Sequence, residues 1–503
     1  MNLNRPTVNE RKPAQQSADT IKAPAARLAE RVALSGFALY AIFAPHSIAG
    51  AELALILVGF GWLLRLLITR RTFIKRSALD VPILLFLGWT ILSAVFSAEP
   101  RISLPKLQSI AVVLLFYFTQ SILTRRTVVL IAVLMIASGV AGVLGSVFDL
   151  ARGRGVMIEE LSAESPFHEL QMGTGDAVWR VEGRRIRSVE EIDEAIRQKR
   201  AGERLPVSII KQGEHDDRPG FIVTDEMKVR PTPSGIRSNG PTHRFRASAW
   251  TRHYETFSET LQILAQLSLG LSLAHLQRRN SRRKYIYLAL AATALLTLGI
   301  ALAAMRTVLV ALSIGAAVIT LRMARGRARL IVAAVIVLAL ALGALAIWRT
   351  RTRGALTLED HSASLRWNVA RVGLSRIRQH PVFGHGMDAV KNHWTEWGFP
   401  GTDMIHLHST PLQIAFDRGL PALLFWLWLM ASCWLMAARA EKLFRDFTDA
   451  NRHGLLLGAT GAIAGFFASS LVNYNFGDAE VALVFWWLLG TMVVLSAREE
   501  RNL

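Results

Sequence analysis

The sequence predicts a mainly α-helical, polytopic membrane protein with about twelve transmembrane helices and one small α+β soluble insert. Of its 503 residues, 51% are hydrophobic and 19% are charged, against about 25% charged in ordinary globular chains. Many of the apolar residues stand in runs that approach the ~20 residues needed to cross a bilayer. The short segments between these runs alternate between rich and poor in Lys and Arg. These observations exclude an ordinary soluble protein.

The charge balance is strongly basic, with 58 Lys and Arg against 38 Asp and Glu, a net charge of +20. Such a balance is typical of proteins that bind nucleic acid or an anionic lipid surface. Because the basic residues cluster beside apolar runs, we interpret them as topology signals and contacts to membrane lipids, with no nucleic-acid partner. The single cysteine, Cys433, excludes a disulfide framework and a cysteine-based zinc site.

The candidate spans are apolar segments, taken in chain order. They are 32–43, 51–68, 81–96, 107–123, 128–150, 257–276, 285–303, 307–321, 330–348, 420–438, 455–471 and 481–496. The polar stretch before them, residues 1–31, has no hydrophobic segment of its own and is expected to be a disordered tail, not a cleaved signal peptide.

Orientation follows from the Lys and Arg clusters, which come after every even-numbered span. This places both termini in the cytoplasm. The expected organisation is a cytoplasmic tail, helices 1–5, an outer insert, helices 6–9, a second outer loop, and helices 10–12 with a cytoplasmic tail. These parts are 1–31, 32–150, 151–256, 257–348, 349–419 and 420–503.

The insert reads as a folded domain of its own. Strand patterns at 177–181, 205–211 and 220–223 surround an amphipathic helix at 188–200, which has Ser188 as its N-cap. This order, with the Gly153-Arg154-Gly155-Val156 stretch before it, resembles a bacterial PDZ domain.

The resemblance implies that Gly153, Gly155 and Val156 lie in a loop and strand, 153–158, that binds the end of a peptide or protein by strand addition. Two alternatives remain open for the insert. It is a small domain that only packs against the membrane part, or a PDZ relative that has lost binding.

The second outer segment carries ordered motifs. Arg366 precedes a Trp-containing helical run, residues 380–386 read HPVFGHG, and His408-Ser409 is followed after nine residues by Gly419. This order resembles the O-antigen ligase and polymerase superfamily of bacterial envelope glycosyltransferases, over about residues 285–496. The family expects Gly, Thr or Tyr three residues after the last glycine, and this chain has Ala422.

The resemblance implies a glycosyltransferase that moves a glycan from an undecaprenyl-diphosphate carrier to a hydroxyl acceptor, inverting, metal-independent and without a cofactor. The His-Ser-x9-Gly spacing is the ligase form, which favours lipid A-core as the acceptor. An O-antigen or exopolysaccharide polymerase and a protein O-oligosaccharyltransferase are the alternatives within the same superfamily.

His408 is the candidate general base, because a neutral imidazole can take the proton of the acceptor hydroxyl. Arg306 and Arg366 match the family's diphosphate ligands, and guanidinium groups bind phosphate oxygens bidentately. The structural alternatives are a helix cap or interfacial ring for His408, snorkelling for Arg306 and an ion pair to Glu359 or Asp360 for Arg366.

The remaining candidates support these three residues, which we expect to converge on one cavity. His406 supports His408, and Arg101 with Lys106 adds positive charge. Gly384 and Gly386 allow the tight turn. The His406 and His408 pair lacks a third ligand at a familiar spacing, so we expect no metal.

Two rival functions belong to other classes. A polysaccharide or lipid transporter or flippase also has many spans, but its charged residues are expected near the bilayer midplane, and the sequence shows no internal repeat. A membrane scaffold that gathers partners through the insert is the third possibility.

Overall fold

The computed structural model describes residues 13–211, 213–251, 253–278, 282–324, 326, 357–401, 405–445 and 449–497. The chain divides into two compact units, each described by itself below. The first, called the helical unit, is Met1–Ser138 with Gln262–Ala294 and Thr307–Leu503. The second, called the insert unit, is Gly139–Leu261 with Leu295–Arg306.

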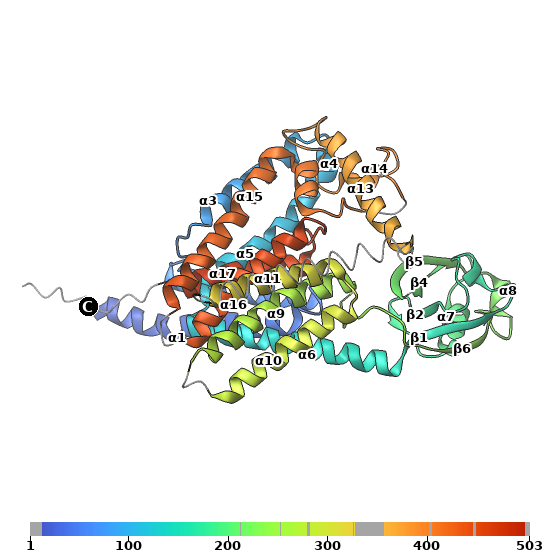
Figure 1. Ribbon diagram of the computed structural model, residues 1–503, viewed down its shortest axis with the longest axis horizontal. Coiled ribbons are helices and arrows are strands. Elements are labelled where there is room, and N and C mark those ends of the chain that lie inside the picture. Colours follow the sequence, from blue (N-terminus) through green and yellow to red (C-terminus); the bar gives the residue numbers. More distant parts are fainter. Residues whose placement is uncertain are drawn as a thin grey trace, which may run out of the picture. The chain divides into compact units, whose positions relative to one another are not determined.

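The apolar runs of the sequence form helices (Figure 1). The helices outside the sheet domain are α1 (Pro13–Phe43), α2 (Ile48–Thr69), α3 (Asp80–Phe96), α4 (Pro100–Ser103), η1 (Pro105–Val113), α5 (Leu114–Ile122), α6 (Arg125–Arg152), α9 (Tyr254–Leu276), α10 (Arg283–Leu302), α11 (Arg306–Met323), α13 (Thr357–Ile377), α14 (Ala389–His393), α15 (Thr410–Phe444), α16 (Ala450–Ser470) and α17 (Ala479–Ser496). The predicted span 330–348 lies outside the described residues.

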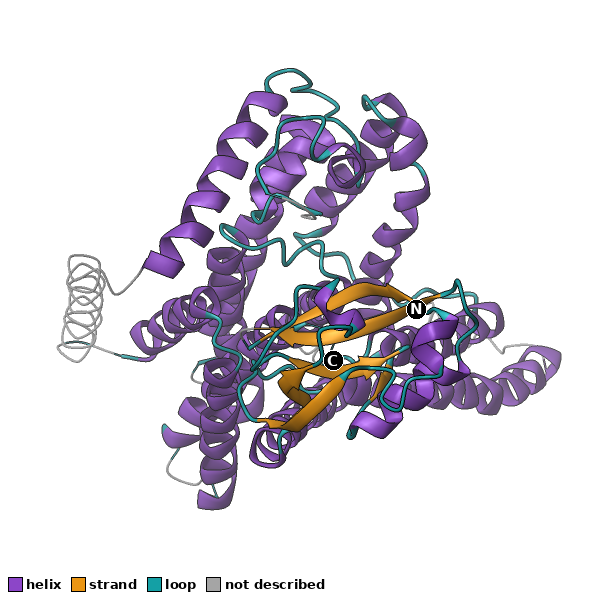
Figure 2. Ribbon diagram, turned by 90° about the vertical axis from the view of Figure 1, so that its right-hand side faces the viewer, coloured by secondary structure: helices purple, strands orange, loops and turns teal. Residues whose placement is uncertain are grey.

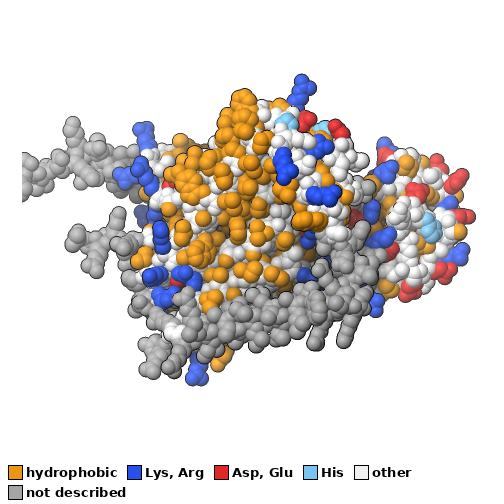
Figure 3. Space-filling model, turned by 45° about the horizontal axis from the view of Figure 1, so that its top comes forward, with side chains coloured by type: hydrophobic (Ala, Val, Ile, Leu, Met, Phe, Trp, Pro, Cys, Tyr) orange, Lys and Arg blue, Asp and Glu red, His pale blue; other side chains and the backbone are white. Residues whose placement is uncertain are grey.

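Seven helices in the described part of the chain are long and apolar enough to cross a membrane: α2, α6, α10, α11, α15, α16 and α17. Helix α3 is apolar but shorter. The prediction of a mainly α-helical, polytopic membrane protein is therefore confirmed, and the total of about twelve spans stays a prediction. Figure 3 shows hydrophobic side chains covering the middle of the helical unit, with Lys and Arg gathered toward its ends.

The centre of the helical unit contains α9, which is buried although it is rich in polar residues. Its Gln266 amide donates to the carbonyl of Ala311 on α11 at 3.4 Å. A Cβ on Gly270 of α9 would lie 2.4 Å from the backbone nitrogen of Gly458 on α16, so only glycine permits this close crossing. Small residues and interhelical hydrogen bonds are how helices associate where hydrophobic burial gives no net gain.

The insert unit contains one antiparallel sheet with strand order β5-β4-β2-β1-β6, with β3 paired to β2 (Figure 2). Its strands are β1 (Arg154–Leu161), β2 (Ala177–Val181), β3 (Arg184–Arg185), β4 (Arg204–Lys211), β5 (Glu214–Ile222) and β6 (Ile236–Thr242). The sheet is accompanied by η2 (Pro166–His168), α7 (Val189–Gln198) and α8 (Asp225–Lys228). The predicted small α+β insert is confirmed.

The core of the insert forms between one face of the sheet and α7. Ile192 and Ile196 of α7 are completely buried and belong to one cluster with Val178 of β2 and Ile209 of β4. The helix periodicity and the strand alternation of the sequence therefore meet in one apolar layer.

Strand β1 requires a correction to the predicted peptide site. It pairs with β2 on one side, where Val156 faces Val178, and with β6 on the other, where Arg154 faces Thr242. Strand addition needs an open edge, and both edges of β1 are already hydrogen-bonded. Peptide addition along 153–158, with Gly153, Gly155 and Val156 as its residues, is therefore wrong for this strand.

The two glycines instead serve the sheet itself. Gly153 and Gly155 have φ values of 85° and 69°, beside an irregular register between β1 and β6. A Cβ on Gly155 would lie 2.5 Å from the carbonyl oxygen of Val178. Between them, Arg154 is buried, bonded to Asp149 at 2.5 Å and 4.6 Å from the Phe245 ring, so this segment is a structural feature.

Candidate functional site

His408 lies in the short segment before α15 and has a left-handed backbone, with φ of 52°. Such a conformation in a residue other than glycine costs about 1–3 kcal/mol and persists only when its surroundings hold it. On one side, the Leu407 N–H donates to Gln413 Oε1 at 2.7 Å. On the other, the Thr410 N–H donates to the Asn473 carbonyl at 3.0 Å. The strained residue is thus fixed on both sides.

His406 is the nearest neighbour of His408. The His408 N–H donates to His406 Nδ1 at 3.3 Å, and the two ring centroids are 4.4 Å apart at an angle of 71°. The two rings are therefore in edge-to-face contact, although the left-handed backbone of His408 means that the segment is not the extended chain for which a shared face was expected. This contact fits the predicted supporting role of His406.

Arg366 of α13 lies close enough to His408 to act on its charge. Burial, followed by the positive charges of His406 and Arg366, lowers the pKa of His408 to about 3. The imidazole of His408 therefore stays neutral at ordinary pH, near the Arg366 guanidinium group, which stays protonated. The alternative for Arg366, an ion pair to Glu359 or Asp360, involves two residues whose backbone the structure describes but whose side chains it does not.

Arg306, the third predicted residue, is the exposed first residue of α11. Its convergence with His408 and Arg366 stays a prediction. Within the helical unit, the next residue, Thr307, accepts a hydrogen bond from Asn473 Nδ2 at 3.2 Å. The backbone carbonyl of Asn473 also accepts from Thr410, so the residue after Arg306 is linked through Asn473 to the start of α15.

The HPVFGHG turn packs against a break in α15. Gly419 has φ 81° and ψ 172° within the helix, and a Cβ there would lie 1.8 Å from the Val382 carbonyl oxygen. The freed backbone groups pair with the turn, because the Leu420 N–H donates to Pro381 O at 2.8 Å. The nine residues between His408-Ser409 and Gly419 therefore correspond to the stretch of α15 that runs from its first residue to this break.

Gly384 and Gly386 bring the turn close to the same helix. A Cβ on Gly384 would lie 2.5 Å from the Asp417 carbonyl, and the Gly386 N–H donates to Asp417 O at 3.0 Å. Their φ values of 72° and 110° are those that glycine adopts readily. The predicted need for a turn with close backbone approach is confirmed.

The loop that carries Arg101 and Lys106 lies against the other side of the turn. The Glu99 N–H donates to His385 O at 3.0 Å. Lys106 forms an ion pair with Asp388 at 2.9 Å, and both side chains are more than 40% exposed. Its charge is therefore shared with a carboxylate, whereas Arg101 is exposed on α4. Their contribution to anion binding stays a prediction.

Sequence reasoning missed a polar group beneath the two histidines. The Tyr474 ring lies 5.6 Å from that of His406, and the charge of the buried Arg418 acts on its hydroxyl. Desolvation raises the pKa of Tyr474, which keeps the phenol neutral. Arg418 could have been predicted as a functional candidate, because it is a charged residue at the start of an apolar run. Nothing in the sequence indicates that it lies near Tyr474.

Residues 291–427 match the family model described as O-antigen ligase. This segment is O-antigen ligase-like. It contains Arg306, Arg366, His408 and Gly419, in the order that the motifs predicted. No match to the chain was found among curated proteins. The chain is thus a multi-pass membrane protein in which residues 291–427 are similar to the O-antigen ligase family.

In the described part of the O-antigen ligase-like chain, no group of three His, Cys, Asp or Glu residues is arranged to hold a metal ion. His406 and His408 offer at most one ligand nitrogen each, and His406 Nδ1 already accepts a hydrogen bond. The expectation of metal-independent chemistry stays a prediction.

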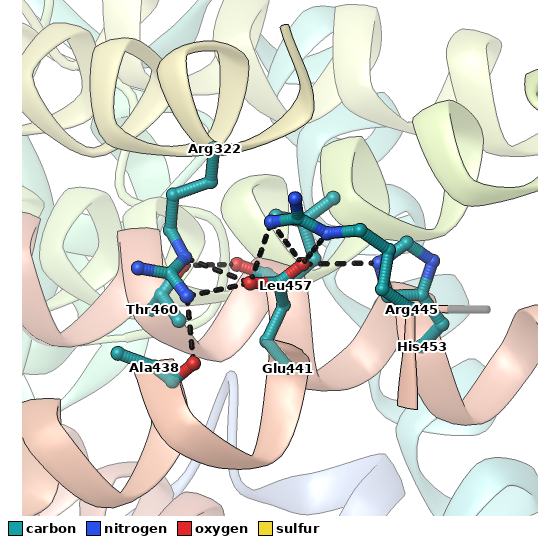
Figure 4. Close-up of polar contacts among 7 residues, drawn as sticks. All are labelled: Arg322, Ala438, Glu441, Arg445, His453, Leu457 and Thr460. Carbon is teal, nitrogen blue, oxygen red and sulfur yellow. Dashed lines mark hydrogen bonds and ion pairs between the residues drawn. The ribbon is translucent and has the colours of Figure 1, made fainter. Parts of the chain in front are cut away.

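A second buried polar cluster of the O-antigen ligase-like protein lies near the other end of α15 (Figure 4). Glu441 is fully buried and accepts from Arg322 of α11 at 2.6 Å, from Arg445 at 2.9 Å and contacts His453 of α16 at 3.2 Å. About thirty helical residues, on the order of 40 Å, separate it from His408. This cluster joins three helices and is distinct from the candidate site.

Proposed function

We propose that this O-antigen ligase-like protein transfers a glycan from undecaprenyl diphosphate to a hydroxyl group of an acceptor, at the outer face of the bacterial inner membrane. Both termini are then cytoplasmic, and lipid A-core is the favoured acceptor. One observation carries the proposal: the imidazole of His408, which burial keeps neutral, lies close enough to Arg366 for that positive charge to act on it. This pairing suits the two tasks of the reaction, which are to activate a hydroxyl and to hold a diphosphate.

The reaction is a direct displacement at the anomeric carbon. The acceptor oxygen forms its bond to C1 from the side opposite the diphosphate, and the C1–oxygen bond to the diphosphate breaks with inversion. The hydroxyl proton passes to His408, and the electron pair of the broken bond leaves with undecaprenyl diphosphate. Arg366 and Arg306 bind the diphosphate oxygens on which negative charge increases.

The environment of His408 also couples the base to the donor. Burial and the nearby positive charges hold its pKa low in the free protein. A bound diphosphate neutralises part of that positive charge, so donor binding raises the pKa of His408 and makes it a stronger base. The proton is then accepted best when the leaving group is in place.

The pH dependence follows from this arrangement. Because the pKa of His408 is about 3 in the free protein, kcat/KM for the donor should stay level between about pH 5 and pH 7 instead of falling through the ordinary histidine range. The acid limb of kcat, measured at saturating donor, should lie at higher pH than that of kcat/KM. In Arg366→Gln, loss of the positive charge should move the acid limb of kcat/KM toward neutral pH. A wild-type acid limb near the ordinary histidine pKa would contradict the assignment.

The function itself is tested by reconstituting the full chain in vesicles with a lipid-diphosphate glycan and three acceptors. These are lipid A-core, a second lipid-linked repeat and a Ser- or Thr-containing protein. Mass spectrometry identifies the acceptor that gains the glycan, and we expect lipid A-core. Gain of mass on the second or third acceptor would instead identify a polymerase or a protein O-oligosaccharyltransferase. Movement of the donor across the bilayer without any transfer would favour the transporter or flippase.

A further inference from the structure

A cavity of about 550 Å³ lies beside the C-terminal half of α13, outside the contacts of His408. Its polar and aromatic lining comes from Arg371, Ser375, Arg376, Arg378, Gln379 and Trp397, and none of the residues that line it is acidic. This volume falls within the ordinary range of small-ligand sites. Three guanidinium groups in one cavity make it strongly attractive to an anion.

The described side chains of the protein place no carboxylate against the positive charges in this cavity. Among the described residues, none of Arg371, Arg376 and Arg378 forms an ion pair. Of the acids that follow in the described part of this segment, Asp388 is paired with Lys106 at 2.9 Å and Glu396 with His393 at 2.6 Å. An anionic ligand would therefore meet guanidinium donors without first displacing a protein carboxylate.

Arg376 and Trp397 form a rigid wall of the cavity. Arg376 donates to the Trp397 carbonyl at 3.0 Å and to Gln379 Oε1 at 3.2 Å. The Trp397 ring stacks on His393 with centroids 4.7 Å apart and lies 4.9 Å from the His385 ring. A fixed aromatic ring among hydrogen-bond donors suits a sugar, which has both an apolar ring face and polar hydroxyl groups.

The cavity is connected to the candidate site through α13. Arg366 and Arg376 are ten residues apart, about 15 Å along a helix. Between them, Gly373 packs closely on Leu407, because a Cβ there would lie 2.5 Å from the Leu407 side chain. A contact of 3.0 Å between His385 Nε2 and the Arg376 carbonyl oxygen joins the HPVFGHG turn to the same region.

We infer that this cavity is a subsite for an anionic sugar, phosphorylated or carboxylated, of the acceptor glycan. The sugar binds by its charge to Arg371, Arg376 and Arg378 and by its ring to Trp397, while the acceptor hydroxyl reaches His408 a short distance along the glycan. The assignment to the acceptor rests on the proposed glycosyl transfer. The anion-binding property of the cavity does not.

The test uses the full chain in phosphatidylcholine vesicles and the double variant Arg371→Gln with Arg378→Gln. Both side chains are exposed, and Arg376 is retained because it holds Trp397. Equilibrium dialysis with labelled glucose 6-phosphate and labelled glucose measures binding without turnover. We expect the wild type to prefer glucose 6-phosphate, and the double variant to bind it about tenfold more weakly, since charge-assisted hydrogen bonds are lost. Arg439→Gln, an exposed change on α15, is the matched control and should bind as the wild type.

Transfer assays with matched acceptors, with and without phosphate groups, then identify the source of the anion. In the double variant, KM for the phosphorylated acceptor should rise about tenfold with kcat unchanged, and KM for the dephosphorylated acceptor should stay constant. Equal binding of glucose 6-phosphate by wild type and double variant would overturn the subsite. An effect that appears only when phosphatidylglycerol is added would overturn the acceptor assignment in favour of a lipid headgroup. Arginine-dependent binding without transfer to any acceptor would support the subsite and contradict the proposed function instead.

Discussion

Replacing His408 by alanine is expected to reduce glycan transfer by about 10²–10⁴-fold, the usual contribution of a positioned general base. Without the imidazole, the acceptor hydroxyl must lose its proton to water as it attacks C1. The diphosphate ligands are untouched, so the KM for the donor should change little. The measurement is the rate at which the acceptor gains the mass of the glycan in the reconstituted system.

The left-handed backbone of His408 calls for a second variant. Alanine is unfavourable at φ of 52°, whereas asparagine tolerates this region more readily. His408→Asn therefore separates loss of the base from backbone strain, and it should be as inactive as His408→Ala. His380→Ala, an exposed histidine of the HPVFGHG turn, is the control that should keep transfer. Wild-type rates in both His408 variants would remove the base assignment.

The largest effect on stability is expected at Glu441. Its carboxylate is fully buried and is bonded to Arg322, Arg445 and His453. Glu441→Gln keeps the shape but removes the negative charge, which leaves two buried or half-buried guanidinium groups uncompensated. Breaking a buried ion pair in this way costs about 3–5 kcal/mol. Thermal unfolding in detergent should show a clear fall in Tm.

Glu52→Gln provides the matched comparison, because Glu52 is exposed on α2 and the same atoms are exchanged. A surface substitution of this kind changes stability by no more than about 0.5 kcal/mol. Equal Tm values for the two variants would show that the Glu441 cluster does not stabilise the packing of the three helices. At a temperature where Glu441→Gln is still folded, the transfer rate per folded molecule should match the wild type, since the cluster is distant from His408.

Local patterns in the sequence were sufficient for much of the architecture. Apolar runs predict helices because a bilayer requires length and hydropathy, which are properties of one segment alone. The amphipathic period of α7 and the alternation of β4 likewise predict their own burial. The motif around His408 was also readable, because the spacing to Gly419 is set by a single stretch of helix.

Contacts between segments that are far apart in the chain could not be predicted from these local patterns. The sequence predicts β1 as the edge that binds a peptide, but β6, about eighty residues later in the chain, is hydrogen-bonded to that edge. Tyr474 and Arg418 are 56 residues apart, and only the packing of α15 against the segment before α17 brings them under His406. The charge of each arginine on α13 is plain in the sequence, whereas the cavity they share with Trp397 depends on the turn that follows.

The amino-acid pattern alone was enough to predict a membrane protein, its α+β insert and the residue types of the candidate site. Hydropathy, helical period and short motifs involve residues that are close together in the chain, so the sequence alone is sufficient to recognise them. The packing of the chain was needed to see that His408 is strained and held neutral near Arg366, that β1 is paired on both sides, and that three arginines without an ion pair to the described residues line one cavity. These properties depend on burial and on which groups become neighbours, and both are fixed only when segments far apart in the sequence pack together.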